Sequence, residues 1–166
     1  MNGVIVYDSY YGNTGQVAEA LAEELRALGN VVTVVNLHKQ RLDPSKPPVA
    51  GADFLGVGGP TRIKNMSRRA RSFAKKLDPA KLGDIRAFCF DTWGPLDEDP
   101  AKNGEDNQWL FPGGGAKTRD ELAGAGFAVY PVVLRCLVTG MKGPLAEDAL
   151  DSARQFARRF AADELS

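Results

Sequence analysis

Short apolar segments alternate along this chain with longer segments in which apolar residues recur every three or four positions. The short segments are rich in β-branched residues, as strands are, and the longer ones have the periodicity of amphipathic helices. The expected strands are residues 4–7, 31–35, 53–57, 85–90 and 128–133, the last continuing irregularly through 134–138. The expected helices begin near residues 13, 65, 118 and 145. This alternation predicts an α/β fold with a five-stranded parallel sheet and helices on both faces.

The first strand runs into a turn at residues 9–14 that is rich in hydroxyl groups and precedes a helix. Backbone N–H groups at a helix N-terminus have no internal partner, and the helix dipole is positive there, so the turn is suited to a phosphate group. Ser9 and Thr14 can add donors, and Gly12 permits a tight turn. No lysine or arginine precedes Leu25, so neutral donors are expected to bind the phosphate. An ordinary polar connection is the alternative interpretation.

Two further loops, residues 58–65 and 92–95, leave the carboxyl ends of expected strands. Ligands of open parallel sheets bind beyond this edge, where the strand order reverses. In the strand order 2-1-3-4-5, these two loops and the turn at 9–14 lie side by side. Ile63 and Trp93 would then be placed to sandwich a flat aromatic ring. No arginine or lysine is close to loop 92–95 in the sequence, so negative charge on such a ring is expected to be poorly compensated.

Length and composition fit one soluble domain spanning residues 1–166, with 43% apolar and 25% charged residues. The 21 basic and 21 acidic side chains cancel, which argues against nucleic acid or an anionic membrane as a partner. No apolar run approaches the roughly 18 residues of a transmembrane helix. The first strand begins without a basic leader, so a signal peptide is not expected and the predicted location is cytoplasmic. Cys89 and Cys136 sit in apolar runs and are expected to be buried free thiols.

Other polar groups give no catalytic dyad and no metal site, so no catalytic or metal-binding residue is named. His38, the only histidine, is interpreted as a solvated loop residue. Residues 62–76 carry seven basic side chains and no acid, which fits either a solvated helix face or a docking surface for an acidic partner or ligand. Residues 96–115 form a long acidic loop that Trp109 and Phe111 are expected to anchor.

These motifs resemble those of the flavodoxins. Residues 9–14, Ser-Tyr-Tyr-Gly-Asn-Thr, resemble the flavodoxin phosphate loop, (Ser/Thr)-x-Thr-Gly-x-Thr. Residues 59–66 resemble the second flavin loop of Wrb-type quinone reductases, and residues 92–94 fall where flavodoxins have the third. The resemblance implies a three-layer, short-chain flavodoxin-like fold that binds FMN non-covalently. The cofactor-binding residues it implies are Ser9, Tyr10, Tyr11, Gly12, Asn13 and Thr14 for the phosphate, and Pro60, Thr61, Arg62, Ile63, Thr92, Trp93 and Gly94 for the ring.

The chain departs from the flavodoxin pattern at several places. Tyr11 replaces a threonine of the phosphate loop, and Arg62 and Ile63 stand where the second loop often has an aromatic residue. Flavodoxins are usually strongly acidic, whereas this chain is balanced. The long insertion that splits the fifth strand of long-chain flavodoxins is missing.

Three functions are compatible with this resemblance. The first is a low-potential electron carrier that serves redox partner proteins, in which a carbonyl of residues 58–62 accepts the flavin N5 proton and Gly58 or Gly59 eases the peptide rotation. The second is an NAD(P)H-dependent FMN reductase of quinones or other small acceptors, with Arg62 and the basic stretch attracting the pyridine nucleotide. The third is a non-enzymatic module that binds FMN or a partner.

Overall fold

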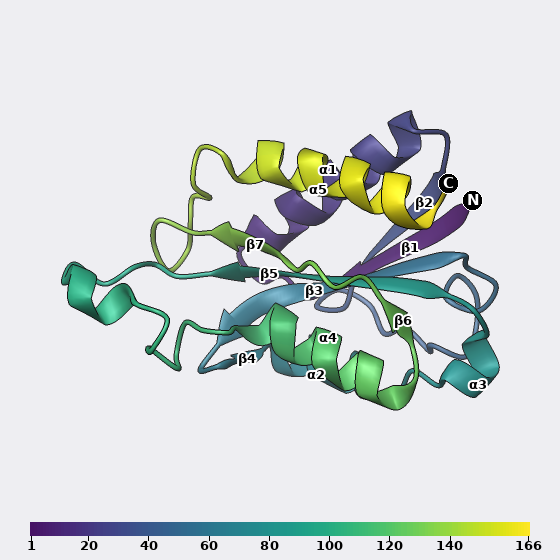
Figure 1. Ribbon diagram of the computed structural model, residues 1–166, viewed down its shortest axis with the longest axis horizontal. Coiled ribbons are helices and arrows are strands. Elements are labelled where there is room, and N and C mark those ends of the chain that lie inside the picture. Colours follow the sequence, from purple (N-terminus) through teal and green to yellow (C-terminus); the bar gives the residue numbers. More distant parts are fainter.

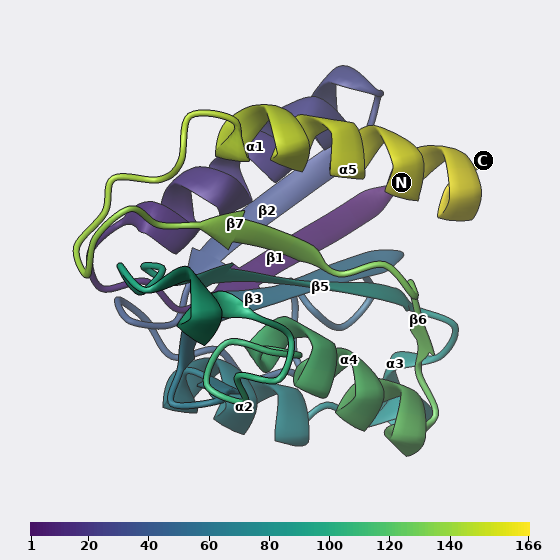
Figure 2. The same cartoon turned by 60° about the vertical axis from the view of Figure 1, so that its left-hand side comes forward.

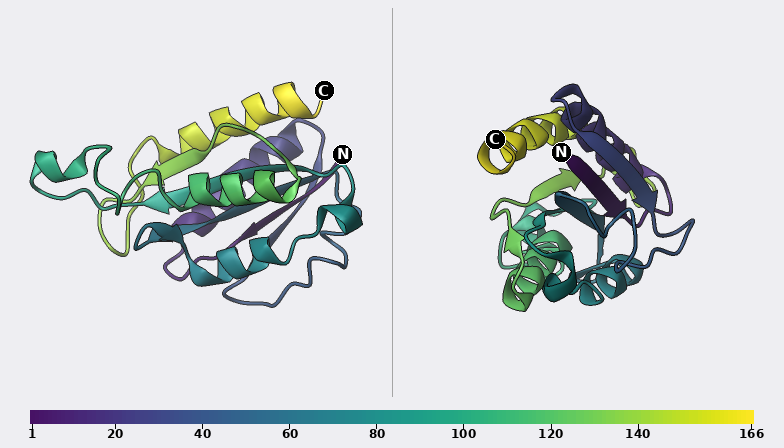
Figure 3. Two further views of the ribbon diagram at one scale, coloured as in Figure 1. Left: turned by 60° about the horizontal axis from the view of Figure 1, so that its bottom comes forward. Right: turned by 90° about the vertical axis from the view of Figure 1, so that its right-hand side faces the viewer.

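A parallel sheet lies between two layers of helices in the computed structural model, which describes residues 1–166 (Figure 1). Helices α1 (Asn13–Ala27) and α5 (Ala149–Glu164) cover one face of the sheet, and α2 (Arg68–Lys75) and α4 (Gly114–Ala125) cover the other. The end-on view in Figure 3 shows the same two layers. The strands are β1 (Asn2–Tyr7), β2 (Val31–Asn36), β3 (Phe54–Arg62), β4 (Asn65–Met66), β5 (Arg86–Trp93), β6 (Ala128–Val129) and β7 (Leu134–Leu137). The three-layer α/β architecture predicted from the sequence is confirmed.

The strand order is β2-β1-β3-β5-β6, and β7 also pairs with β5. β6 pairs with the start of β5 and β7 with its end, both in parallel, so together they occupy the fifth position of the sheet. The fifth strand is therefore in two parts, with residues 130–133 between them, and the predicted order 2-1-3-4-5 holds. β4 is a two-residue antiparallel addition to the end of β3.

Strands β3 and β5 are longer than the sequence predicts. The ladder between them continues past the expected ends, pairing Gly58 with Phe90, Gly59 with Asp91 and Pro60 with Thr92. Residues 58–62 and 92–93, expected in loops, are thus strand residues. Glycine is a poor strand former, but here its missing side chain makes room for an aromatic ring, since a Cβ on Gly58 would lie 2.2 Å from the ring of Phe90.

Two apolar cores fill the spaces between the sheet and its helices. The core beneath α1 and α5 is aromatic, with Phe54, Phe88, Phe90, Phe156 and Phe160 among its residues. The core beneath α2 and α4 is mainly aliphatic. Because the carboxyl ends of all the parallel strands meet at one edge between these cores, the segments that leave this edge are held by a rigid scaffold.

Several element boundaries differ from expectation for local reasons. Met66 pairs with Thr61 in β4, so α2 begins only at Arg68. The helix expected at residue 118 begins at Gly114, where two backbone N–H groups bond to side chains of β3 and β5. Two short helices were not predicted: α3 (Pro79–Leu82) and the 3₁₀ helix η1 (Pro100–Asn103). The second lies in the long connection between β5 and α4, which projects beyond the sheet edge at the left of Figure 1 and comes in front of the sheet in Figure 2.

Candidate functional site

A cleft of about 700 Å³ opens at the carboxyl edge of the sheet, between the ends of β1, β3 and β5. It brings together residues of all three predicted segments and adds Val138 and Met141, which the sequence analysis did not select. Eleven of the thirteen predicted cofactor-binding residues line it. Gly12 and Thr14 do not, because Thr14 is buried behind the wall and Gly12 lies in the adjoining hollow. The lining residues from the three segments are Ser9, Tyr10, Tyr11, Asn13, Pro60, Thr61, Arg62, Ile63, Thr92, Trp93 and Gly94.

The turn before α1 forms a nest of backbone donors. Gly12 has a φ of 95°, a left-handed conformation that favours glycine, and its N–H donates to the Ser9 hydroxyl at 3.1 Å. No side chain caps the helix, so the chain offers no partner to the N–H groups of Asn13, Thr14 and Gly15. Unpaired donors at the positive end of a helix make a site for an anion.

A buried hydroxyl pair joins this turn to the end of β5. The side-chain oxygens of Thr14 and Thr92 lie 2.8 Å apart, and both residues are almost fully buried. One hydroxyl donates to the other, which leaves one hydroxyl proton available for a further acceptor. The pair fixes the phosphate side of the cleft relative to the strand that carries Trp93.

A cation that the sequence analysis missed lies beside the same turn. The ammonium group of Lys142 is 5.8 Å from the ring centre of Tyr11. The neighbouring Gly143 packs so closely that a Cβ there would be 2.5 Å from Oδ1 of Asn13. A segment distant in the sequence thus brings one positive charge beside Tyr11, whereas the expectation that neutral donors bind the phosphate stays a prediction.

The hairpin between β3 and β4 turns on two residues in a conformation that suits glycine. Ile63 and Lys64 have φ values of 47° and 75°, which is unusual for residues with a Cβ and strained for a β-branched one. Ile63 lines the cleft and is 73% exposed. Gly58 and Gly59, expected to ease a peptide rotation beside the cleft, are instead held in the ladder with β5.

Behind the cleft, β5 carries a buried carboxylate surrounded by donors. Asp91 is fully buried and accepts hydrogen bonds from Nε of Arg135 at 2.9 Å, the Thr61 hydroxyl at 2.6 Å and the Gly115 N–H at 3.1 Å. The Thr61 hydroxyl in turn accepts from the N–H of Gly114 at 2.8 Å. This network joins β3, β5, β7 and the start of α4 directly beneath the residues that line the cleft.

The guanidinium of Arg135 also lies against the aromatic wall. Its central carbon is 4.4 Å from the ring centre of Trp93 and 5.4 Å from that of Phe111, and the two rings are 5.3 Å apart. The expectation that no cation lies near residues 92–95 is wrong, because Arg135 comes from a different strand. Its charge is matched by Asp91, however, so the pair adds little net charge beside the cleft.

Phe111 anchors the long connection, as predicted, through its contact with Trp93. Trp109 is 53% exposed and meets the ammonium of Lys64 at 5.0 Å from its ring centre. The second half of the connection is therefore held at two points, by Phe111 against Trp93 and by Trp109 against Lys64.

The lining of the cleft carries little charge. Arg62 is the one charged residue that lines it. His38 is partly buried and packs edge-on against Tyr10, with ring centres 5.0 Å apart. Cys89 and Cys136 are buried and free, as predicted, and burial raises the pKa of each thiol to about 12. No group of three or more histidine, cysteine or carboxylate side chains is arranged to hold a metal ion. None of the helices has the length and apolar character needed to cross a membrane.

These residues fit the flavin nucleotide that the sequence resemblance implies. The uncapped helix N-terminus offers donors for a phosphate, and Trp93 and Ile63 offer apolar surface for a ring. The volume of the cleft is in the range of pockets that hold cofactors. Which of the lining residues contact the cofactor stays a prediction.

Comparison with known proteins identifies the family of the chain. Residues 4–123 match the family model described as a flavodoxin domain. The flavodoxin of Aquifex aeolicus is 34% identical over 94 residues, which are 57% of this chain and 43% of that protein. An uncharacterised protein of Methanocaldococcus jannaschii is 29% identical over 91 residues, 55% of this chain and 23% of that protein. The chain thus spans less than half the length of these two relatives.

Solved structures show the same fold over nearly the whole chain. Oxidised flavodoxin 1 of Bacillus cereus superposes with a TM-score of 0.72 at 18% identity, covering 100% of both chains. A flavodoxin from the Archaea gives a TM-score of 0.69 at 20% identity, covering 98% of both chains. A WrbA-like flavodoxin of Agrobacterium tumefaciens gives 0.63 at 23% identity, covering 98% of this chain and 96% of that one.

Proposed function

The chain belongs to the flavodoxin-domain family, and from this premise we propose that it is a low-potential electron carrier serving redox partner proteins. Its cofactor is FMN, as in the family, and bound FMN supplies the electron-transfer chemistry. The role of the protein's own residues is to bind the cofactor, to cover it and to set the charge around it.

The observation that carries the proposal is the position of two side chains from different strand ends. Trp93 at the end of β5 and Ile63 in the hairpin turn after β3 both line the cleft. A flat ring held between them would be covered by a side chain on each face and would reach solvent by an edge. Such a ring could pass electrons through its edge but would offer little free face on which a nicotinamide could stack.

Charge around the cleft supports a low reduction potential. The nearest buried cation, Arg135, is neutralised by Asp91, and Arg62 is exposed to water. Negative charge gained by the ring on reduction therefore finds little compensation, which disfavours the reduced state. The turn at Ile63 lies beside the cleft, and a backbone carbonyl of this turn is the group we propose to accept a proton from the ring edge.

A second function, NAD(P)H-dependent reduction of quinones or other small acceptors, is favoured by one observation. Arg62 lines the cleft, is exposed and is in none of the ion pairs of the chain, so it is free to bind a nucleotide phosphate. A third, non-enzymatic role in binding FMN or a partner requires neither electron transfer nor turnover. In each case we propose a cytoplasmic protein, where two buried free thiols are stable.

A reductive titration of the FMN-loaded protein separates these functions. A carrier takes up electrons in two resolved one-electron steps and is not bleached by NADPH or NADH alone. Rapid bleaching by a pyridine nucleotide without a partner reductase would instead assign the reductase function. Absence of bound FMN in the visible spectrum after reconstitution would overturn both. The variant Trp93→Ala should raise the fluorescence of bound FMN, since the indole ring no longer quenches it.

A further inference from the structure

A second hollow lies on the α2 side of the sheet, away from the FMN cleft. It is a groove of about 560 Å³ between α2 and the connection that follows β2, residues 37–44. None of its lining residues lines the cleft at the carboxyl edge. The lining residues are Leu37, Gln40, Arg41, Leu42, Asp43, Pro44, Arg69, Ser72, Phe73 and Lys76.

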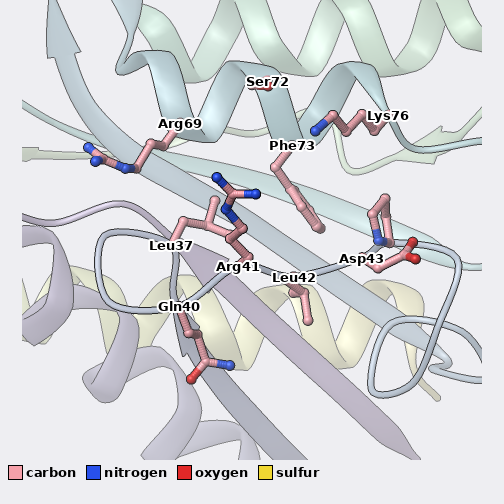
Figure 4. A pocket seen from close by; sticks show the side chains of 10 residues that line it. Leu37, Gln40, Arg41, Leu42, Asp43, Arg69, Ser72, Phe73 and Lys76 are labelled. Atoms are coloured by element: carbon pink, nitrogen blue, oxygen red, sulfur yellow. The ribbon is translucent and has the colours of Figure 1, made fainter.

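Three cations from two elements face this groove. Arg69 and Lys76 come from α2 and the residue that follows it, and Arg41 comes from the opposite wall (Figure 4). None of the three is in an ion pair of the chain. Like charges brought together without a counter-charge repel one another, and this repulsion is relieved when an anion binds between them.

Asp43 is the one acid of the groove, and its carboxylate is occupied elsewhere. It accepts hydrogen bonds from the N–H and the hydroxyl of Ser45 at 2.9 and 2.7 Å, and Lys46 lies 3.9 Å away. In Figure 4 it lies toward the Lys76 end of the groove, while the guanidinium of Arg41 points toward α2 on the side of Arg69. The Arg41–Arg69 end is therefore the part of the groove with uncompensated positive charge.

The floor of the groove is apolar. The ring of Phe73 points from α2 toward the connection (Figure 4), but it is only 4% exposed and belongs to the core beneath the groove, whereas Leu42 is a partly buried apolar side chain of the lining. Leu37 extends this surface toward the carboxyl edge. Two guanidinium groups beside a hollow whose accessible apolar surface comes from leucine side chains match a ligand that has an apolar body and a phosphate group. A stable complex with an acidic protein would bury about 800 Å² of this chain, which is more surface than the groove alone offers.

We propose that this groove is a binding site for a small nucleotide, whose phosphates bind Arg41 and Arg69 and whose base rests on Leu37 and Leu42. The site goes beyond the electron-carrier function and does not depend on it.

Calorimetric titration of the FMN-loaded protein with ADP tests the proposal, because loading keeps ADP out of the flavin site. ADP is expected to bind with one site per chain, and adenosine and inorganic pyrophosphate each more weakly than ADP. Arg41→Gln and Arg69→Gln should each weaken ADP binding by about tenfold or more, as expected for the loss of a charged hydrogen-bonding partner. The FMN affinity of both variants should be unchanged.

Arg68→Gln is the matched control. Arg68 precedes Arg69 on the same helix and is exposed, but it does not line the groove. An equal loss of ADP binding in this variant would mean diffuse attraction by a basic helix face and would overturn the site. Displacement of ADP by an acidic peptide at lower concentration than by ATP would overturn it in favour of a protein-docking surface. Neither result bears on the electron-carrier proposal, which fails only if FMN does not bind or does not cycle.

Discussion

The hydroxyl oxygens of Thr14 and Thr92 meet at 2.8 Å in the interior, one at the start of α1 and the other near the end of β5. These two strand–helix units share no ladder, since β1 and β5 are separated by β3. The hydroxyl pair is thus a direct link between the phosphate nest and the wall that carries Trp93, and it makes the two parts of the cleft one rigid unit.

Substitutions at Thr14 and Thr92 separate the structural role of the hydroxyl pair from the role of Thr14 in binding FMN. Thr14→Val and Thr92→Val should each lower the stability of the FMN-free protein by about 1 kcal/mol, because each leaves one buried hydroxyl without its partner. Thr14→Val should in addition weaken FMN binding by about 1–3 kcal/mol through loss of a hydrogen bond to a charged group. Urea denaturation and fluorescence titration give the two quantities. Equal FMN affinities in the two variants would show that Thr14 has only a structural role.

Removal of the Arg135 guanidinium should be strongly destabilising. In Arg135→Met, the fully buried Asp91 loses its countercharge. Removing one partner of a buried ion pair lowers the free energy of unfolding by about 3–5 kcal/mol. The double variant Arg135→Met with Asp91→Asn should recover most of this stability, because the uncompensated charge is gone. Arg158→Met, which breaks an exposed pair with Glu24, is the control and should cost no more than about 1 kcal/mol. Thermal denaturation of the four proteins is the measurement, and a single variant as stable as the control would contradict the account.

Two glycine-to-alanine changes should act in opposite directions. Gly58→Ala places a methyl group in the space of the Phe90 ring and should destabilise the protein by about 1–3 kcal/mol. Gly124 lies in α4, and a methyl group added there would have no atom of a neighbouring residue within 4 Å, so Gly124→Ala should stabilise by about 0.5–1 kcal/mol. Both effects can be measured as shifts of the urea unfolding midpoint, provided that the dependence of the unfolding free energy on urea concentration is unchanged. A neutral Gly58→Ala would mean that the ring of Phe90 moves aside without cost.

The hairpin turn beside the cleft should be relaxed by glycine. Ile63→Gly removes a β-branched side chain from a left-handed conformation and should stabilise the FMN-free protein by about 1 kcal/mol. Ile63→Ala keeps the conformational cost while removing the same exposed side chain, so it serves as the control. If the two variants prove equally stable in urea, the turn is not strained in solution.

Stability should decline at alkaline pH because the buried thiols resist ionisation. Burial raises the pKa of Cys89 and Cys136 from 9.0 to about 12 in the folded protein. The folded state therefore holds protons that the unfolded chain releases, and this contribution is complete below pH 9 and is lost as the pH rises toward 12. Each thiol should account for about 1.4 kcal/mol per pH unit in this window. Urea denaturation at several pH values should give a shallower decline for Cys89→Ala, and an unchanged slope would refute the linkage.

The order of strands and the position of the cleft follow from features that are local in the sequence. Apolar runs, helical periodicity and right-handed connections are enough to bring residues 9–14, 60–63 and 92–94 to one edge. The ends of the strands could not be predicted in the same way. Gly58 and Gly59 favour a loop by propensity, and they extend β3 because they pair with Phe90 and Asp91 of the neighbouring strand.

The side chains that the sequence analysis missed all act across long sequence separations. Arg135 meets Asp91 and Trp93, and Lys142 meets Tyr11, through contacts that no local pattern encodes. One signal was available for Arg135: a charged residue within an apolar segment expected to be buried needs a partner of opposite charge. Lys142 offered no such signal, since it lies in an exposed connection where lysine is common.

The division of the fifth strand affects whether a strand of another molecule can pair with this edge of the sheet. An uninterrupted outer strand presents a row of free backbone groups to which another chain can add in register. Here β6 has two residues and β7 has four, and Pro131 between them has no N–H to offer. Addition of a strand from another molecule along this edge of the sheet is thereby discouraged.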